Sequence, residues 1–333
     1  MKILFLGTAA GKPSNHRNVT SIAVILENTE FILIDCGEAT QHQLMKSTLR
    51  YNKLGSIFIT HMHGDHIFGL PGLLCSLNEI RSETLSICGP KGLKSYIESS
   101  LNFTKLNYKI HVTEFTESYG KAAKITSGNY LYEVDFCKVL HSVTCFAYKI
   151  KQSRNLLKID KTKIDIPINY YRKELEELGF EPAEQIISTL KSNITITMED
   201  GFIFDVKDYS YKEPPFELII ALDNYDSKHM ISVFKSCHAL IHECTYAIFP
   251  NEKEGERAKI TKTALSHWHS TNVMAVETAK LLKAKTLMLT HFSNRYDFDD
   301  EEKIVAGCIK YAENKSMQIF CARDFSEFCI CNK

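Results

Sequence analysis

A histidine-rich segment that follows an apolar run is the feature that most limits how this chain can fold. The run at residues 57–59 is typical of a buried strand, and Thr60–His66 comes directly after it. Because a strand end fixes the backbone, the first two histidines point one way, and the turn at Gly64 carries the next aspartate and histidine round. Imidazole and carboxylate groups suit zinc or a similar divalent metal. The loop can therefore serve two adjacent cations, with His61 and His63 on one and Asp65 and His66 on the other.

Three more residues of the same types stand at the ends of apolar runs. His141 comes just before the stretch at 143–150, and Asp223 and His291 each end such a run. A single residue of this kind is more often a turn residue or a satisfied core group. Together the three complete a site in which His61, His63 and His141 hold one metal and Asp65, His66 and His291 hold the other. We expect Asp223 to bridge the metals, because a carboxylate has two oxygens and a charge that offsets two cations.

The wider set of motifs resembles a known enzyme family. The histidine-rich segment is similar to the signature of the metallo-β-lactamase superfamily. The ordered set resembles ribonuclease Z, the endonuclease family that removes 3′ trailers from precursor tRNA. The motifs that carry the resemblance cover most of the chain outside residues 151–200. They are Leu6–Thr8, Pro13–Ser21, Asp35–Gln41, Thr60–Leu73, His141–Val143, Leu240–Glu243, His269–Thr271 and Leu289–Ser293.

The order of elements predicts an α/β fold. Two halves of strands and helices, with ligands at strand ends, suit a four-layer αββα sandwich, and we expect one domain over residues 1–333. Residues 151–200 differ in charge pattern and predict a protruding inserted arm. Its start is rich in basic residues, and a solvated loop is the alternative interpretation. The functional interpretation is an arm that binds the tRNA backbone, since phosphate contacts give affinity without reading sequence. The candidate contacts are Lys151, Arg154 and Lys158.

The resemblance implies a hydrolytic site with two zinc ions per subunit. Asp65 would both ligate a metal and accept the proton of the attacking water. His269 is the candidate acid for the leaving 3′ oxygen, and Glu243 would orient it and raise its pKa. The alternative for this pair is a structural polar contact near a helix start. We expect Asp35 to orient a ligand or its loop.

The same resemblance suggests how the substrate is bound. Arg17 and Asn18 would hold the acceptor end of the tRNA. Ser270 and Thr271 are further candidates for substrate contact, and one of the two also caps a helix predicted at 271–283. The resemblance implies a homodimer in which the arm of one subunit serves the site of the other.

Composition limits the alternatives. The eleven cysteines are scattered and form no paired zinc motif, so reduced, mostly buried thiols and a cytoplasmic location are expected. No apolar run approaches membrane-spanning length, so we expect no contact with a membrane. Gly7 and Gly11 could suggest a phosphate-binding loop, but no Gly-Lys-Ser/Thr follows them, so we expect no nucleotide cofactor. The net charge of zero is unusual for a nucleic-acid enzyme, which makes local charge more important. A small-molecule hydrolase of the same superfamily and a metal-free RNA-binding subunit remain as alternatives.

Overall fold

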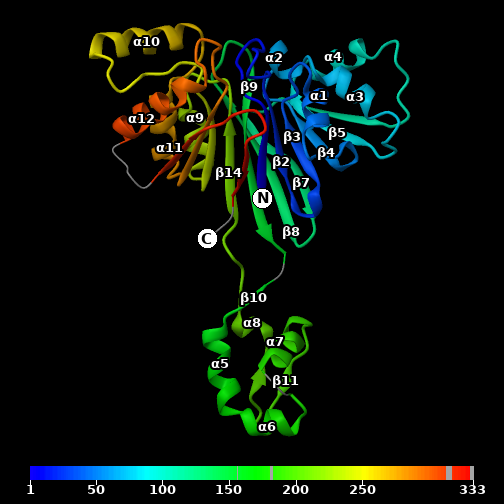
Figure 1. Cartoon of the computed structure of the whole chain (residues 1–333). Helices are drawn as coiled ribbons and strands as arrows, with labels where there is room; N and C mark the ends of the chain where they lie inside the picture. The colour runs from blue at the N-terminus through cyan, green and yellow to red at the C-terminus, as the bar shows by residue number, and fades with distance from the viewer. Residues whose placement is uncertain (156, 181–182, 313–316, 331–333) are drawn as a thin grey trace. The chain divides into compact units, whose positions relative to one another are not determined.

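The computed structural model describes residues 1–155, 157–180, 183–312 and 317–330, and it divides the chain into two compact units (Figure 1). The first comprises Met1–Gly128, Tyr132–Gln152 and Phe216–Lys333. Its strands form two sheets of seven. The first sheet runs β18 (Glu327–Cys329), β1 (Lys2–Gly7), β2 (Ser21–Ile25), β3 (Phe31–Ile34), β4 (Leu54–Phe58), β5 (Leu85–Pro90) and β6 (Ile110–Phe115). The second runs β17 (Gln318–Cys321), β16 (Thr286–Thr290), β15 (Ala239–Glu243), β14 (Phe216–Ala221), β9 (Cys145–Arg154), β8 (Tyr130–Val139) and β7 (Tyr119–Ser127).

Helices cover the outer face of each sheet, which confirms the predicted αββα sandwich (Figure 1). The first sheet carries α1 (Thr40–Lys46), α2 (Gly64–Ile67), α3 (Leu70–Ser76) and α4 (Leu93–Ser100). The second carries α9 (Lys228–Phe234), α11 (Asn272–Leu281) and α12 (Glu301–Ala312), whereas α10 (Glu254–Ser266) buries only Ala264 and contributes no residue to the core under this sheet. Aromatic rings pack between the sheets, where Phe115 of β6 stacks on Phe136 of β8 with centroids 3.9 Å apart. Buried aromatic and aliphatic area of this kind is the main stabilising contribution to the sandwich.

Strand direction brings the ligand-bearing segments to one edge. In the first sheet β3 and β4 are parallel, and in the second β14, β15 and β16 are parallel. The carboxyl ends of parallel strands meet at the same edge of a sheet. Since β9 is antiparallel to β14, the residues that precede β9 reach this edge too. The segments after β3 and β4 thus share one end of the first sheet, and the segments after β14, β15 and β16 and before β9 share one end of the second. Contacts between side chains of the two groups bring these ends together.

The second unit comprises Asn129–Leu131 and Ser153–Pro215. It contains β10 (Lys158–Ile159), α5 (Lys161–Tyr170), α6 (Arg172–Glu177), α7 (Ala183–Lys191), β11 (Ile196–Thr197), β12 (Ile203–Phe204), α8 (Val206–Tyr209) and β13 (Ser210–Tyr211). Ile164, Leu175, Leu190 and Phe204 belong to its own buried core, so the insertion is a folded unit and not a solvated loop. It is longer than the expected 151–200, because β13 pairs with β10, and residues 156 and 181–182 of the predicted arm lie outside the described residues.

Two predictions from composition can be compared with this fold. The cysteines that the structure describes are free, and Cys36, Cys88, Cys137, Cys145, Cys237, Cys244 and Cys308 are buried. Among the described residues, every helix is too short or too polar to cross a bilayer.

Candidate metal centre

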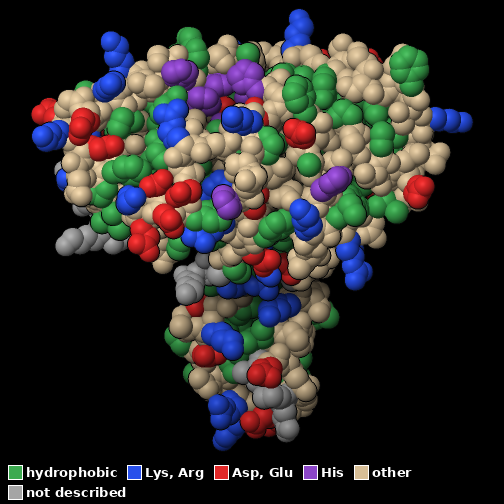
Figure 2. All heavy atoms as spheres, turned by 45° about the horizontal axis from the view of Figure 1, so that its top comes forward, with side chains coloured by type: hydrophobic (Ala, Val, Ile, Leu, Met, Phe, Trp, Pro, Cys, Tyr) green, Lys and Arg blue, Asp and Glu red, His purple; other side chains and the backbone are tan. Residues whose placement is uncertain are grey.

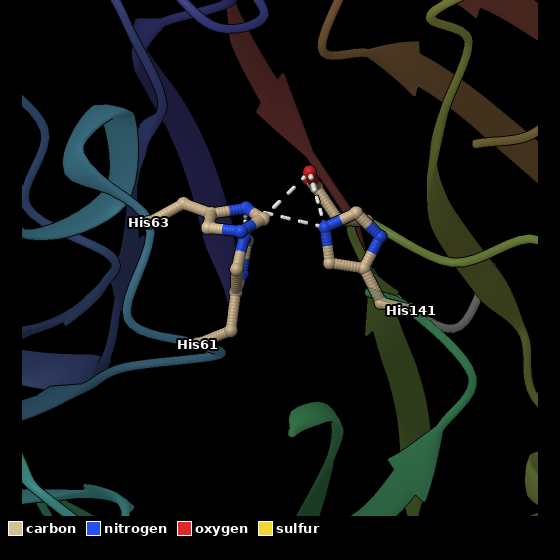
Figure 3. A group of neighbouring side chains, drawn as sticks. His61, His63 and His141 are labelled. Carbon is tan, nitrogen blue, oxygen red and sulfur yellow. Dashed lines mark hydrogen bonds and ion pairs between the residues drawn. The ribbon is translucent and has the colours of Figure 1, made fainter. Parts of the chain in front are cut away.

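The first cluster of ligand-type atoms joins the segment after β4 to the residue before β9. The Nε2 atom of His61 lies 3.0 Å from Nδ1 of His63, and Nδ1 of His63 lies 3.2 Å from Nε2 of His141. Figure 3 shows these three rings turned towards one another. The Oδ2 atom of Asp223 completes the group, 3.7 Å from His61 and 3.6 Å from His141. Three imidazoles and one carboxylate with converging atoms are a donor set for a divalent cation.

The second cluster joins the same segment to the end of β16. The Nε2 atoms of His66 and His291 lie 3.3 Å apart. Each is 3.4 Å from Oδ2 of Asp65. The Oδ1 atom of Asp223 closes the cluster, 3.3 Å from His66 and 3.1 Å from His291. The loop at residues 60–66 thus divides its side chains between two clusters, as its sequence suggested.

Asp223 directs one oxygen to each cluster. Its residue is 2% exposed, and its Oδ1 atom makes no hydrogen bond within the described part of the chain. Burial opposes ionisation of Asp223, but His291, His66 and His61 hold its pKa well below the ordinary value. A buried carboxylate oxygen without a hydrogen bond requires a positive partner. The donor set and this oxygen therefore fit bound cations.

Hydrogen bonds at the outer side of the rings fix which nitrogen faces the clusters. The Nδ1 atom of His66 lies 2.6 Å from Oδ2 of Asp35, and Nδ1 of His141 lies 2.8 Å from the carbonyl oxygen of Trp268. Both oxygens only accept, so each Nδ1 atom carries a proton and the Nε2 atoms are the ones that face the clusters. Asp35 also accepts from the backbone N–H and the hydroxyl of Thr60. Its place fits the orienting role that the sequence suggested.

The electrostatics of the clusters favour cations. Burial lowers the pKa of His61 well below its ordinary value, and burial also lowers the pKa of His141, so both rings stay neutral as ligation requires. Burial alone would lower the pKa of His66, but Asp65, Asp223 and Asp35 raise it well above its ordinary value. This buried region therefore attracts positive charge.

His269 and Glu243 form a pair beside the clusters. The Nδ1 atom of His269 lies 3.1 Å from Oε2 of Glu243 and 3.7 Å from Oδ2 of Asp223. Burial alone would lower the pKa of His269, but Glu243 and then Asp223 raise it to about 9. The imidazole is therefore protonated at neutral pH. Glu243 is buried and also accepts from the hydroxyl of Thr245, so its position is fixed.

Arg17 requires a correction, because it is not free to hold a substrate. Its side chain is 4% exposed and forms a 2.6 Å ion pair with Glu301. Its guanidinium lies 4.6 Å from the ring centroid of Phe292 and 4.8 Å from that of Phe298. Asn18 is partly buried, and its side-chain amide donates to the carbonyl of Glu38. The sequence indicated a basic residue but not the acidic and aromatic partners that bury it.

Ser270 and Thr271 also have structural partners. Both are buried, and the hydroxyl of Ser270 donates to the carbonyl of Asn224. The hydroxyl of Thr271 accepts from the backbone N–H of Met274, which caps α11. The helix-cap prediction is confirmed for Thr271, and direct substrate contact by either side chain is not supported because neither is accessible.

The basic residues predicted for the arm divide between the two units. Lys151 lies on β9 in the first unit and pairs with Asp135 at 2.7 Å. Lys158 lies in the second unit and forms a hydrogen-bonded ion pair with Glu213. Arg154 and Lys158 line one pocket of that unit together with Lys161 and Lys191. Basic side chains therefore gather around this pocket.

Sequence reasoning missed several residues that hold the site. The backbone N–H of Gly11 donates to Oδ2 of Asp65 at 2.7 Å. The hydroxyl of Thr245 lies 2.9 Å from Nδ1 of His291, and the carbonyl of Trp268 holds His141. Backbone groups carry no sequence signal. Thr245 stands two residues after Glu243, at a strand end like the ligands, which is a signal that could have identified it.

The fold and the two clusters define a class of protein: a metal-dependent hydrolase with the metallo-β-lactamase fold. A metallo-β-lactamase-fold protein of Bacillus subtilis shares this fold, with a TM-score of 0.61, 16% identity and 98% of each chain covered. The family model described as Anti-Pycsar protein Apyc1 matches residues 1–143, which is less than half of the chain.

Longer matches identify the family. Ribonuclease Z of Bacillus subtilis is 37% identical over 307 residues, which cover 90% of each chain. The crystal structure of human tRNase Z, short form, matches with a TM-score of 0.63 and 25% identity over all of both chains. The chain belongs to the ribonuclease Z family and is a metal-dependent endoribonuclease by type.

Proposed function

We propose that the chain is a zinc-dependent enzyme that cleaves the 3′ trailer from precursor tRNA. The products would be a tRNA with a 3′-hydroxyl and a trailer with a 5′-phosphate. The observation that carries the proposal is the joint placement of seven nitrogen and oxygen ligands in a chain that matches ribonuclease Z over 90% of its length. The ligands are His61, His63, Asp65, His66, His141, Asp223 and His291.

Two zinc ions fit this donor set better than magnesium, which prefers oxygen ligands. His61, His63 and His141 would hold one, Asp65, His66 and His291 the other, and Asp223 both. When bound, such ions lower the pKa of a water molecule and offset charge on the phosphate.

Asp65 and His269 would carry the proton transfers. The carboxylate of Asp65, held by the N–H of Gly11, would accept a proton from the attacking water. The P–O3′ bond breaks, and the leaving 3′ oxygen of the tRNA needs a proton. His269, which Glu243 keeps protonated, would donate it from the ring nitrogen opposite its bond to Glu243.

The inserted unit would bind the body of the tRNA. Support comes from the basic side chains Arg154, Lys158, Lys161 and Lys191 around one of its pockets.

We also propose a cytoplasmic homodimer, as the resemblance implies. A measurement of the molecular mass of the protein in solution tests whether it is a dimer.

Cleavage of a trailer-bearing precursor tRNA with mapping of the product ends tests the function. We expect cleavage at the end of the acceptor stem, a 3′-hydroxyl on the tRNA half, and loss of cleavage in His63→Ala. Hydrolysis of a small phosphodiester without cleavage of the precursor would contradict the tRNA assignment.

A further inference from the structure

Trp268, the one tryptophan of the chain, lies where three segments of the metal centre meet. Its carbonyl oxygen accepts from His141 at 2.8 Å, and the next residue is His269. Its ring lies edge-on to Tyr225, with centroids 5.2 Å apart, and Tyr225 follows Asp223 by two residues. The residue is nevertheless 45% exposed. A large aromatic surface therefore faces solvent beside the proposed acid and the clusters.

The backbone at this position is one that glycine normally occupies. The N–H of Trp268 donates to the carbonyl of Leu265, and the N–H of His269 donates to the carbonyl of Ala264. This is the Schellman pattern that ends a helix, here α10, and it requires a left-handed residue after the C-cap. Trp268 has φ +64°. Such a conformation is strained for a bulky side chain and unstrained for glycine.

The backbone of Trp268 ends α10 and accepts a hydrogen bond from His141, but neither role requires an indole side chain. A glycine at this position would end α10 and present the same carbonyl to His141 without strain. Strain that is retained near a functional site points to a role for the side chain. The neighbouring surface agrees with a role in binding, because Leu140 and Val143 on either side of His141 are 46% and 40% exposed. Figure 2 shows histidine side chains gathered on one face with hydrophobic side chains beside them.

We propose that the indole of Trp268 stacks on an unpaired nucleobase next to the scissile phosphate. The inference rests on the proposed function, since it takes RNA as the substrate. Aromatic side chains bind unpaired bases by stacking, and this tolerates any base because each has a π-face. The 3′ end of a precursor tRNA is single-stranded around the cleaved bond, so its bases are free to stack. The ring of Tyr225 packs nearly perpendicular to the indole, at 74°, and Trp268 remains 45% exposed beside it.

Kinetics of Trp268→Gly and Trp268→Phe on precursor tRNA test the proposal. Loss of one stacked base should lower kcat/KM for the glycine variant by roughly 5- to 100-fold, mostly through KM. The phenylalanine variant should recover most of this loss, and hydrolysis of a small diester without a base should fall much less. Phe103→Ala, which removes another exposed aromatic ring, is the matched control and should leave the cleavage of precursor tRNA unchanged.

Fluorescence supplies a reading that does not depend on turnover. Because the chain has one tryptophan, its emission reports this position alone. A single-stranded RNA that spans the cleavage site should quench the emission, and abasic nucleotides on both sides of the scissile phosphate should remove most of the quenching. Unchanged kcat/KM in Trp268→Gly, an equal loss on both substrates, or equal quenching by the abasic RNA would overturn the proposal. If the wild-type protein did not cleave precursor tRNA at all, the proposed function would fail instead.

Discussion

At the scale of single residues, the site depends on side chains that hold the ligands in place. Asp35 is fully buried and bonds the Nδ1 atom of His66, although it belongs to a different strand segment. Its φ of +60° is a conformation that asparagine also tolerates. An amide in place of the carboxylate would therefore keep the shape of the site and change the partner of His66.

We expect Asp35→Asn to weaken metal binding by about 10- to 100-fold, the usual cost of losing a carboxylate partner of a ligating histidine. Titration of the apoprotein with zinc measures this affinity. Asp226→Asn, which changes a partly exposed carboxylate, is the control. An unaltered affinity for zinc would show that Asp35 does not act through His66.

His269 should separate chemistry from metal binding. If it protonates the leaving oxygen, His269→Ala should lower kcat by about 10²- to 10⁴-fold, which is the usual contribution of a general acid. The metal content, measured by elemental analysis, should stay at the wild-type value. A parallel fall of metal content and kcat would make His269 a ligand.

Glu243 should set the pH at which His269 loses its proton. Glu243 is part of what raises the pKa of His269 to about 9, so Glu243→Gln should lower that pKa. Since the acid is active when protonated, the rate falls as pH rises through the pKa. The alkaline fall of kcat should therefore begin at a lower pH in the variant. A pH profile of the same shape as that of the wild type would count against this pair.

At the scale of elements, the segment after β1 is tied to the second half of the sandwich. Arg17 lies in this segment, and Glu301 lies at the start of α12. Both charges are largely buried, and Glu301 also pairs with Arg323 at 2.8 Å, so the carboxylate joins two basic residues. The resemblance had suggested a substrate contact, but the contacts of Arg17 are those of a residue that joins two elements.

Arg17→Met should lower the free energy of unfolding by about 1–3 kcal/mol, because the Oε1 atom of Glu301 loses its partner while the Oε2 atom keeps the ion pair with Arg323 at 2.8 Å. Chemical denaturation measures the loss. The double variant Arg17→Met with Glu301→Gln should recover part of the loss, since the carboxylate oxygen that lost its partner is then part of a neutral amide. If Arg17→Met kept the stability of the wild type but raised KM for precursor tRNA, Arg17 would be a substrate contact after all.

At the scale of the whole molecule, the inserted unit has its own core, and all seven proposed ligands lie in the other unit. Replacing residues 155–213 with a short flexible linker should therefore preserve metal content and hydrolysis of a small diester. Cleavage of precursor tRNA should fall at least about tenfold if several phosphate contacts are lost. Equal loss on both substrates would refute a tRNA-binding role for the unit.

The sequence by itself determined which side chains have the chemistry of metal ligands. Ligand types and their spacing in residues 60–66, together with His141, Asp223 and His291 at strand ends, indicated the side chains that the structure brings together in two clusters. The order of strands and helices, with ligand residues at strand ends, also predicted the αββα layers. These features are local, since each is set by a few neighbouring residues.

Only the tertiary structure decided which polar residues are accessible. Arg17, Ser270 and Thr271 look like surface contacts in the sequence, but residues far away in the chain bury or bind them. The bond between His269 and Glu243 and the one between Trp268 and His141 arise in the same way. Such contacts depend on how parallel strands align and how loops pack above them. That alignment is set by long-range burial of apolar surface, which no short segment encodes.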